Sequence, residues 1–180
     1  MNKAFQLIFW GYLFIFFRIH IGFDLLADPI GYYLIYAGGR LMAERFPVAK
    51  KVEIVAFIGM LISVPGIFVN LAEVNSGIWD LYAEGLFVWK VIVVYYLFGT
   101  WKSAIQGLGH ARLRDRVQMT YVWYMGIHFL MMLYSSFSLN VGGNSWSSLF
   151  LFLSLMVIAM DIVLLVLIAA LRRVGWEEPI

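Results

Sequence analysis

The chain of 180 residues contains no cysteine. This absence excludes disulfide bonds, thiolate zinc sites, thiol–disulfide exchange and cysteine nucleophiles. Charge is also scarce, because Asp, Glu, Lys and Arg make up only 13% of the residues, whereas a soluble globular domain has about 25%. Hydrophobic residues make up 63%. A chain of this length and composition has room for one membrane domain and none for a separate soluble one.

Several catalytic and binding motifs are also missing. No HExxH or comparable metal-ligand spacing occurs, and no glycine-rich phosphate loop follows a predicted strand. No nucleophile motif surrounds Ser63, and Asp161 is the only aspartate expected deep within an apolar segment. Because the basic residues are divided among separate connections, no nucleic-acid partner is expected. An enzyme is therefore the least favoured class, and we expect no metal and no cofactor.

The positive charges that are present follow the connections between apolar segments. Eleven of the thirteen Lys and Arg residues fall in four short stretches: Lys3; Arg40, Arg45, Lys50 and Lys51; Lys102, Arg112, Arg114 and Arg116; Arg172 and Arg173. The alternate connections, residues 72–78 and 138–145, contain neither Lys nor Arg. Basic loops are retained on the cytoplasmic side of a membrane. The pattern predicts an all-α integral membrane bundle of six helices in the lipid bilayer of the cell membrane, with both termini cytoplasmic.

A single membrane domain over residues 1–180 is expected, with helices at 4–22, 29–44, 52–71, 78–101, 119–137 and 146–171. The first helix is interpreted as retained, because Arg18 follows its apolar run where a signal peptide would have small residues. Asp28-Pro29 is a typical helix start. A kink is expected at Pro65. For Lys102–Gln118, a solvated loop is favoured over a basic amphipathic helix, because glycines interrupt the segment.

The segment Phe16–Tyr36 contains a recognisable pattern of acidic and helix-starting residues. Its sequence is FFRIHIGFDLLADPIGYYLIY, in which Asp24 and Asp28 precede an Ile-Gly-Tyr helix start. This pattern resembles the signature of a group of small uncharacterised bacterial membrane proteins. The usual Pro before the second Asp is replaced here by Ala27, and Pro29 follows that Asp instead. The resemblance implies a polytopic membrane protein, and it implies no activity and no ligand residues.

Three ionisable residues are expected at similar depths in the membrane. Counting about 1.5 Å of rise per residue from the predicted helix ends places Lys90, His128 and Asp161 near one level. An unpaired charge there costs roughly 2.5–3.5 kcal/mol, so such residues normally pair or face water. We predict that Asp161 pairs with Lys90 or His128. Two alternatives stay open: Lys90 faces lipid and extends to a headgroup, and His128 is either a hydrogen-bonded packing residue or a proton carrier.

A second group of polar residues is expected nearer the outer surface. Glu84 and Arg18 fall at similar depths and are predicted to pair at the entrance of a polar cavity. The outer rim is expected to carry charges of the solvated kind and one histidine: His20, Asp24, Asp28 and Asp80.

The leading interpretation of the function is a small transporter or solute-binding protein with an outward-opening polar cavity. The alternative is a non-catalytic sensor, immunity or interaction subunit, whose partner is another membrane protein or a second copy of this chain.

Overall fold

The computed structural model describes residues 1–17, 20–21, 23–24, 28–68, 77–106, 110–138, 147–174 and 176. For residues 20, 21, 23, 24, 138 and 147 it describes only the backbone. Within the described ranges the chain is all-α, as predicted. The helices are α1 (Asn2–Phe16), α2 (Asp28–Ala43), α3 (Ala49–Ile62), α4 (Gly77–Gln106), α5 (Ala111–Ser138) and α6 (Ser147–Arg172), with a 3-10 helix η1 (Val64–Ile67) after α3. Two strands of two residues each, β1 (His20–Ile21) and β2 (Phe23–Asp24), pair antiparallel.

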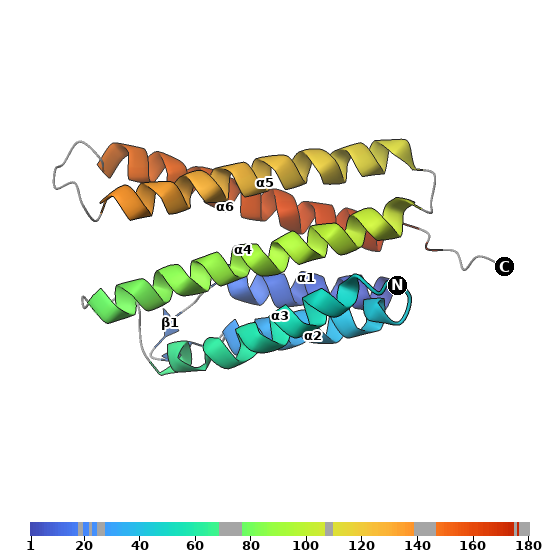
Figure 1. Ribbon diagram of the computed structural model, residues 1–180, viewed down its shortest axis with the longest axis horizontal. Helices are drawn as coiled ribbons and strands as arrows, with labels where there is room; N and C mark the ends of the chain where they lie inside the picture. The colour runs from blue at the N-terminus through green and yellow to red at the C-terminus, as the bar shows by residue number, and fades with distance from the viewer. Residues whose placement is uncertain are drawn as a thin grey trace.

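The six α-helices run back and forth along the long axis of the molecule (Figure 1). Helices α5 and α6 lie together on one side of α4, and α1, α2 and α3 lie on the other. Helices adjacent in sequence pack against each other at α1–α2, α2–α3, α3–α4, α4–α5 and α5–α6, and α1 also packs against α6. The start of α1 and the end of α6 lie at the same end of the bundle, called here the terminal end. The opposite end is called the distal end.

Three predicted helix ends are wrong. Helix α4 ends at Gln106, five residues after the predicted end at 101. Helix α1 ends at Phe16, six residues before the predicted end at 22, and the backbone then forms β1 and β2. Helix α3 ends at Ile62 and is followed by η1, so Pro65 stops the α-helix instead of kinking it. The physical reason is that proline lacks a backbone N–H and disfavours the α conformation of the residue before it. The rest of the predicted third helix, residues 69–71, lies outside the described residues.

Most of the described residues in the basic segment Lys102–Gln118 are helical, so the expectation of a solvated loop is wrong for them: residues 102–106 end α4 and residues 111–118 begin α5. Helix α5 begins at Ala111, and the His110 carbonyl accepts hydrogen bonds from the backbone N–H groups of Leu113 and Arg114. Gly107 and Gly109 precede this start and therefore do not interrupt the helix. The charged side chains of its first two turns are exposed, whereas Val117 is buried. Helix α5 thus extends beyond the apolar core at its terminal end.

Two helices, α4 and α6, are long and apolar enough to cross a membrane, by length and composition. Helices α1, α2 and α3 have 15, 16 and 14 residues, fewer than the roughly 20 that a typical span requires. Helix α5 has 28 residues, but charges occupy its first two turns. The six-helix prediction is therefore confirmed for the helices, while full membrane spans are supported for two of them.

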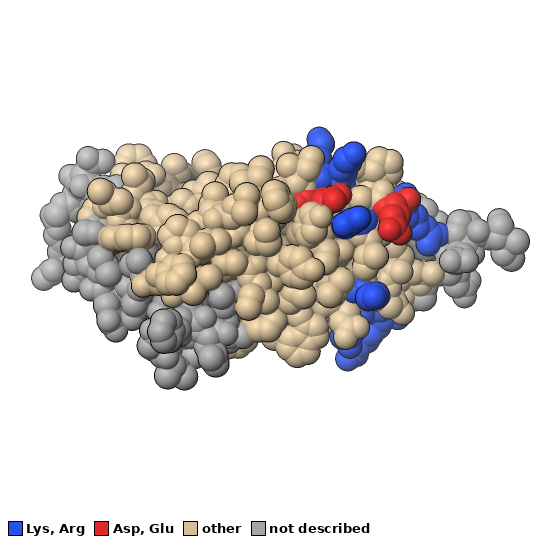
Figure 2. Space-filling model, turned by 90° about the horizontal axis from the view of Figure 1, so that it is seen from below, with Lys and Arg blue, Asp and Glu red and all other residues tan. Residues whose placement is uncertain are grey.

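Charged residues gather at the terminal end. The basic stretches lie where α1, α3 and α5 begin and where α2, α4 and α6 end. On the face seen in Figure 2, Lys, Arg and the acidic residues beside them cluster towards that end, and the middle of the same face has neither sign of charge. The alternation of helix direction brings separate basic segments to one end of the bundle.

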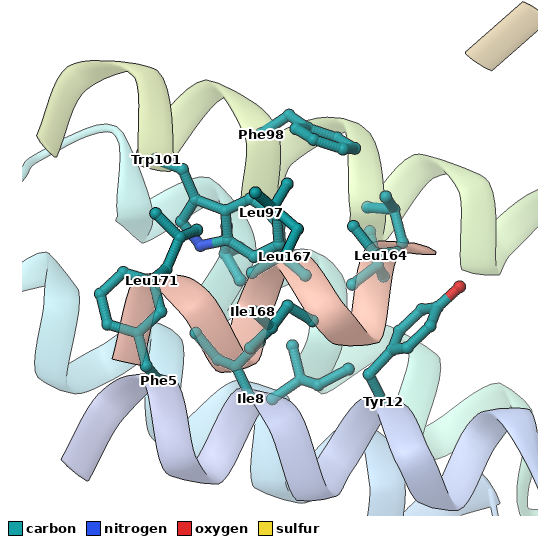
Figure 3. Packing of buried hydrophobic residues seen from close by; sticks show 14 of the residues in the cluster. Phe5, Ile8, Tyr12, Leu97, Phe98, Trp101, Leu164, Leu167, Ile168 and Leu171 are labelled. Atoms are coloured by element: carbon teal, nitrogen blue, oxygen red, sulfur yellow. The ribbon is translucent and has the colours of Figure 1, made fainter. Parts of the chain in front are cut away.

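A packed apolar layer fills the bundle between the terminal end and its middle. Its side chains come from α1, α4 and α6 and interlock in Figure 3: Phe5, Ile8, Leu97, Phe98, Trp101, Leu164, Leu167, Ile168 and Leu171. All are buried. Trp101 also packs against Phe5, and the ring of Phe5 stacks on that of Trp176. This set is called the apolar layer below.

Helices α1 and α2 approach each other closely because glycines lie at their contact. A Cβ added at Gly31 would lie 2.6 Å from Ile15 Cγ1 and 2.7 Å from the Gly11 carbonyl oxygen. A Cβ added at Gly38 would lie 2.9 Å from the Ala4 carbonyl oxygen. Small residues permit such backbone approach between helices. The glycines of α2 therefore determine how close α1 lies to α2. Helix α1 also packs against α6.

Replacing Gly31 by alanine is expected to lower the free energy of unfolding by about 1–3 kcal/mol, because the added methyl overpacks the contact with α1. Gly126→Ala is the matched control, since nothing lies within 4 Å of a Cβ added there. The control gains helix propensity, so its stability should stay equal or rise. Thermal or denaturant unfolding of both variants in detergent measures the difference. Equal stability of the two variants would contradict the close contact.

Candidate functional site

The Asp161 carboxylate, in the middle of α6, is the centre of a buried polar cluster. The residue is 3% exposed, and both of its carboxylate oxygens face donors from other helices. The Tyr12 hydroxyl of α1 donates to Oδ1 at 2.5 Å. The Lys90 ammonium of α4 donates to Oδ2 at 2.8 Å. The predicted pairing of Asp161 with Lys90 is present, and the interpretation of Lys90 as a lipid-facing residue is wrong.

Helix α5 contributes Tyr124 and His128 to the same cluster. They are four residues apart and thus share one helix face, with their rings stacked at a centroid distance of 3.8 Å. The Tyr124 hydroxyl lies 2.8 Å from the Tyr12 hydroxyl. Because Tyr12 donates its hydrogen to Asp161, Tyr124 donates to Tyr12. A chain of hydrogen bonds therefore runs from Tyr124 through Tyr12 to the carboxylate.

His128 is buried, and the contacts of its ring determine where its hydrogen lies. Its Nδ1 is 2.9 Å from the Tyr124 carbonyl oxygen. A carbonyl oxygen can only accept, so Nδ1 carries a hydrogen, and Nε2 of the neutral ring has a lone pair. That Nε2 lies 3.4 Å from Asp161 Oδ1 and has no hydrogen-bond partner among the described residues. A hydrogen bond between these two atoms requires one additional proton, on the imidazole or on the carboxyl group.

Phe87 links the lysine and the histidine. Its ring stacks on that of His128 at 5.5 Å with an interplanar angle of 14°, and Lys90 Nζ lies 5.2 Å from the centre of the same ring. The ammonium is thus held between an aromatic face and a carboxylate. The Lys90 side chain is 14% exposed, so it reaches from the edge of the bundle to the buried aspartate.

A cavity of about 230 Å³ lies beside this cluster, between α1, α2 and α4. Lys90, Asp28 and Tyr32 supply its polar lining, and Ile15, Leu86 and Phe87 belong to its apolar lining. Asp28 is buried, so its prediction as a solvated rim charge is wrong: it begins α2 facing the bundle instead of water. Two charged residues of opposite sign therefore line one cavity.

The cavity and the apolar layer lie on opposite sides of the Asp161 cluster. Along α1, Ile15 of the cavity follows Tyr12, whereas Ile8 and Phe5 of the apolar layer precede it. Along α4, Leu86 precedes Lys90, and Leu97 and Trp101 follow it. The cavity is therefore on the distal side, and tightly packed side chains separate the cluster from the terminal end.

The remaining predicted site residues are not brought into the cluster. Asp80 is exposed, as predicted, and Glu84 is half-buried nearer the start of α4. Arg18 and the side chains of His20 and Asp24 lie outside the described residues, so the pairing of Glu84 with Arg18 stays a prediction. Within the described part of the chain, no group of three His, Asp or Glu residues is arranged to hold a metal ion.

The sequence interpretation missed one member of the cluster, Tyr12 of α1. Tyr12 lies within the apolar run of the first helix, and no polar pattern around it marks it. The signal that could have identified it is general: a tyrosine hydroxyl deep in an apolar helix needs a hydrogen-bond partner. Tyr124 lies one helical turn before His128, and this spacing predicts that the two share a face of the helix. The spacing did not predict its hydrogen bond to Tyr12.

The chain matches no protein-family model, no curated protein and no solved structure. The functional argument therefore depends on the geometry of the Asp161 cluster and its cavity.

Lys90 and Asp161 should prove strongly coupled in a double-mutant cycle. Asp161→Asn leaves the Lys90 ammonium without its partner, and Lys90→Met leaves the carboxylate without it, each at an expected cost of about 3–5 kcal/mol. The double variant removes both charges and should lose about 1–3 kcal/mol less than the sum of the single losses. Unfolding free energies of the four proteins in one detergent provide the measurement. Additive losses would show that the interaction between the two side chains contributes nothing to stability.

Proposed function

We propose that the chain is a six-helix integral membrane protein, with both termini cytoplasmic, that binds and transports a small polar or cationic solute through the cavity beside Asp161. The observation that carries the proposal is the Lys90–Asp161 pair, because Lys90 lines the cavity and contacts the buried carboxylate at once. The resemblance of residues 16–36 to small bacterial membrane proteins agrees with this placement and names no solute.

The membrane placement is supported by where charge and apolar surface lie. The basic helix ends, among them the start of α1 and the end of α6, share the terminal end, as expected if that end is cytoplasmic. Many large apolar side chains of α5 and α6 are exposed, among them Trp123, Phe129, Leu151 and Val166. Contiguous apolar surface of this kind is unfavourable in water. The shorter α1, α2 and α3 can be accommodated by local thinning of the bilayer and by their flanking Lys and Arg residues.

Transport is favoured over a purely structural role by the position of the ionic cluster. An ion pair within a membrane bundle is costly to retain and usually marks a substrate or ion pathway. Here the pair borders a cavity on the distal side, and the apolar layer closes the terminal side. This arrangement corresponds to an outward-facing state, in which Glu84 and Arg18 would shape the entrance.

The His128–Asp161 contact provides a position for one proton. If the carboxyl group binds that proton, its attraction for the Lys90 ammonium falls, and Lys90 becomes free to move towards the cavity. Proton occupancy and solute binding would then be coupled through a single side chain, since the same ammonium forms part of the cavity lining. A cationic solute would compete with Lys90 for Asp161 by the same electrostatics.

The predicted topology can be tested with single cysteines, because the natural chain has none. Asn140→Cys should react with a membrane-impermeant maleimide in intact cells, since the loop without basic residues is expected outside. Arg114→Cys should react only after permeabilisation, since its basic helix start is expected inside. The cysteine-free parent is the control for background labelling. Labelling of both positions from one side would contradict an odd number of crossings between them.

Transport can be tested with purified protein in liposomes on a solid-supported membrane, using a panel of amines, amino acids and sugars under an inward proton gradient. At least one solute class should give a current in the natural protein, and Asp161→Asn should reduce it about tenfold or more, as for loss of a charged contact. Asp115→Asn makes the same chemical change at an exposed position on α5 and should leave the current unaltered.

The outcome that contradicts transport is equally specific. Absence of current for every solute class, together with recovery of a stable membrane partner by crosslinking, would favour the interaction subunit instead. Retention of a solute current in Asp161→Asn would show that transport does not depend on the cluster.

A further inference from the structure

A second cavity, of about 190 Å³, lies between α3, α4 and α5 and contains none of the Asp161 cluster. Its lining includes Lys51 of α3, Lys102 of α4, and the tyrosines Tyr95, Tyr96 and Tyr121. No Asp or Glu is part of this lining. The volume is below the roughly 300–1,000 Å³ of sites that enclose drug-sized ligands. The cavity therefore suits a small anionic group more than a whole solute or cofactor.

The ammonium groups of both lysines of this cavity lie over aromatic rings. Lys102 Nζ lies 3.6 Å from the centre of the Tyr121 ring, and Lys51 Nζ lies 5.9 Å from that of Tyr96. Within the described part of the chain, the ion pairs involve Asp161 with Lys90 and His128, and neither cavity lysine pairs with a carboxylate. Two ammonium groups from different helices thus face one small space with their charge uncompensated.

The tyrosines add hydrogen-bonding groups to the same space. Tyr95 packs against Tyr96 and Tyr121 at centroid distances of 5.2 and 6.3 Å, so the aromatic wall is continuous from α4 to α5. Phenolic hydroxyls can donate to an anion, and two ammonium groups supply the charge. A phosphate group, with several acceptor oxygens and a negative charge, matches this set of donors.

We propose that this cavity binds the phosphate of an anionic phospholipid headgroup. The source of the phosphate rests on the proposed membrane placement. Lys51 lies near the start of α3 and Lys102 near the end of α4, so the cavity is at the basic, terminal end. The leaflet at that end is the cytoplasmic one in the proposed topology, where basic pockets between helices bind lipid headgroups. Tyr95 is half exposed on the side of the bundle, which gives acyl chains an adjoining apolar surface.

The test uses the purified full-length chain in detergent and compares retained lipid by native mass spectrometry. Phosphatidylglycerol should remain bound and should raise the thermal unfolding temperature, whereas phosphatidylcholine should do neither. Lys51→Gln with Lys102→Gln should weaken phosphatidylglycerol binding about tenfold or more, because charge-assisted hydrogen bonds are lost. Lys3→Gln with Lys50→Gln is the matched control: both side chains are exposed and outside the cavity, so this pair makes the same two-charge change, and its effect should stay within about twofold.

Other outcomes separate the possible reasons for binding. An equal loss in the control with Lys3→Gln and Lys50→Gln would overturn the site and indicate diffuse attraction to the basic end. Binding of glycerol phosphate that depends on Lys51 and Lys102, without binding of phosphatidylglycerol, would support the phosphate site and overturn its lipid source. Unfolding temperatures of the lipid-free variants establish that each is folded. The lipid-binding measurement does not involve the Asp161 cluster, so failure of the transport proposal would not affect this result.

Discussion

The ion pair between Asp161 and Lys90 is the interaction on which the interior of the bundle depends. It joins α6 to α4, and the hydrogen bond from Tyr12 to the same carboxylate joins α1 to both. A buried charge is tolerated only when partners replace its lost hydration. The carboxylate therefore requires a particular arrangement of three helices, and α5 completes it through Tyr124 and His128. Movement of any one of these helices would expose an uncompensated charge to apolar surroundings.

Packing elsewhere supports this arrangement from two directions. The glycine contact between α1 and α2 lets α1 lie close to its neighbour while Tyr12 points to the opposite side, towards Asp161. The apolar layer holds α1, α4 and α6 together on the terminal side of the cluster. A rigid apolar layer on one side and a cavity on the other give the cluster unequal surroundings, which is the physical basis for proposing a one-sided entrance.

Much of the fold could be predicted from residue patterns, and the exceptions have local causes. Apolar runs separated by basic stretches predicted all six helices, and depth counting brought Lys90, His128 and Asp161 to one level. The end of α3 was misplaced because Pro65 was treated as a kink within a helix, a treatment that requires a neighbour to satisfy the freed carbonyl. The predicted start of α5 is wrong because a glycine weakens a helix only from within it, and Gly107 and Gly109 both precede Ala111. Tyr12 was missed because an apolar run hides a single hydroxyl.

Periodicity and charge distribution in the chain determine that it forms helices, how many form, and which of their ends carry positive charge, because these depend on neighbours in sequence. Tertiary structure alone decided that Asp161 receives a lysine and a tyrosine, that His128 turns Nδ1 to its own helix, and that Asp28 is buried beside a cavity. Those outcomes depend on the rotation of each helix about its axis and on its distance from the next. Both are set by side-chain packing between segments far apart in the sequence, which no local pattern records.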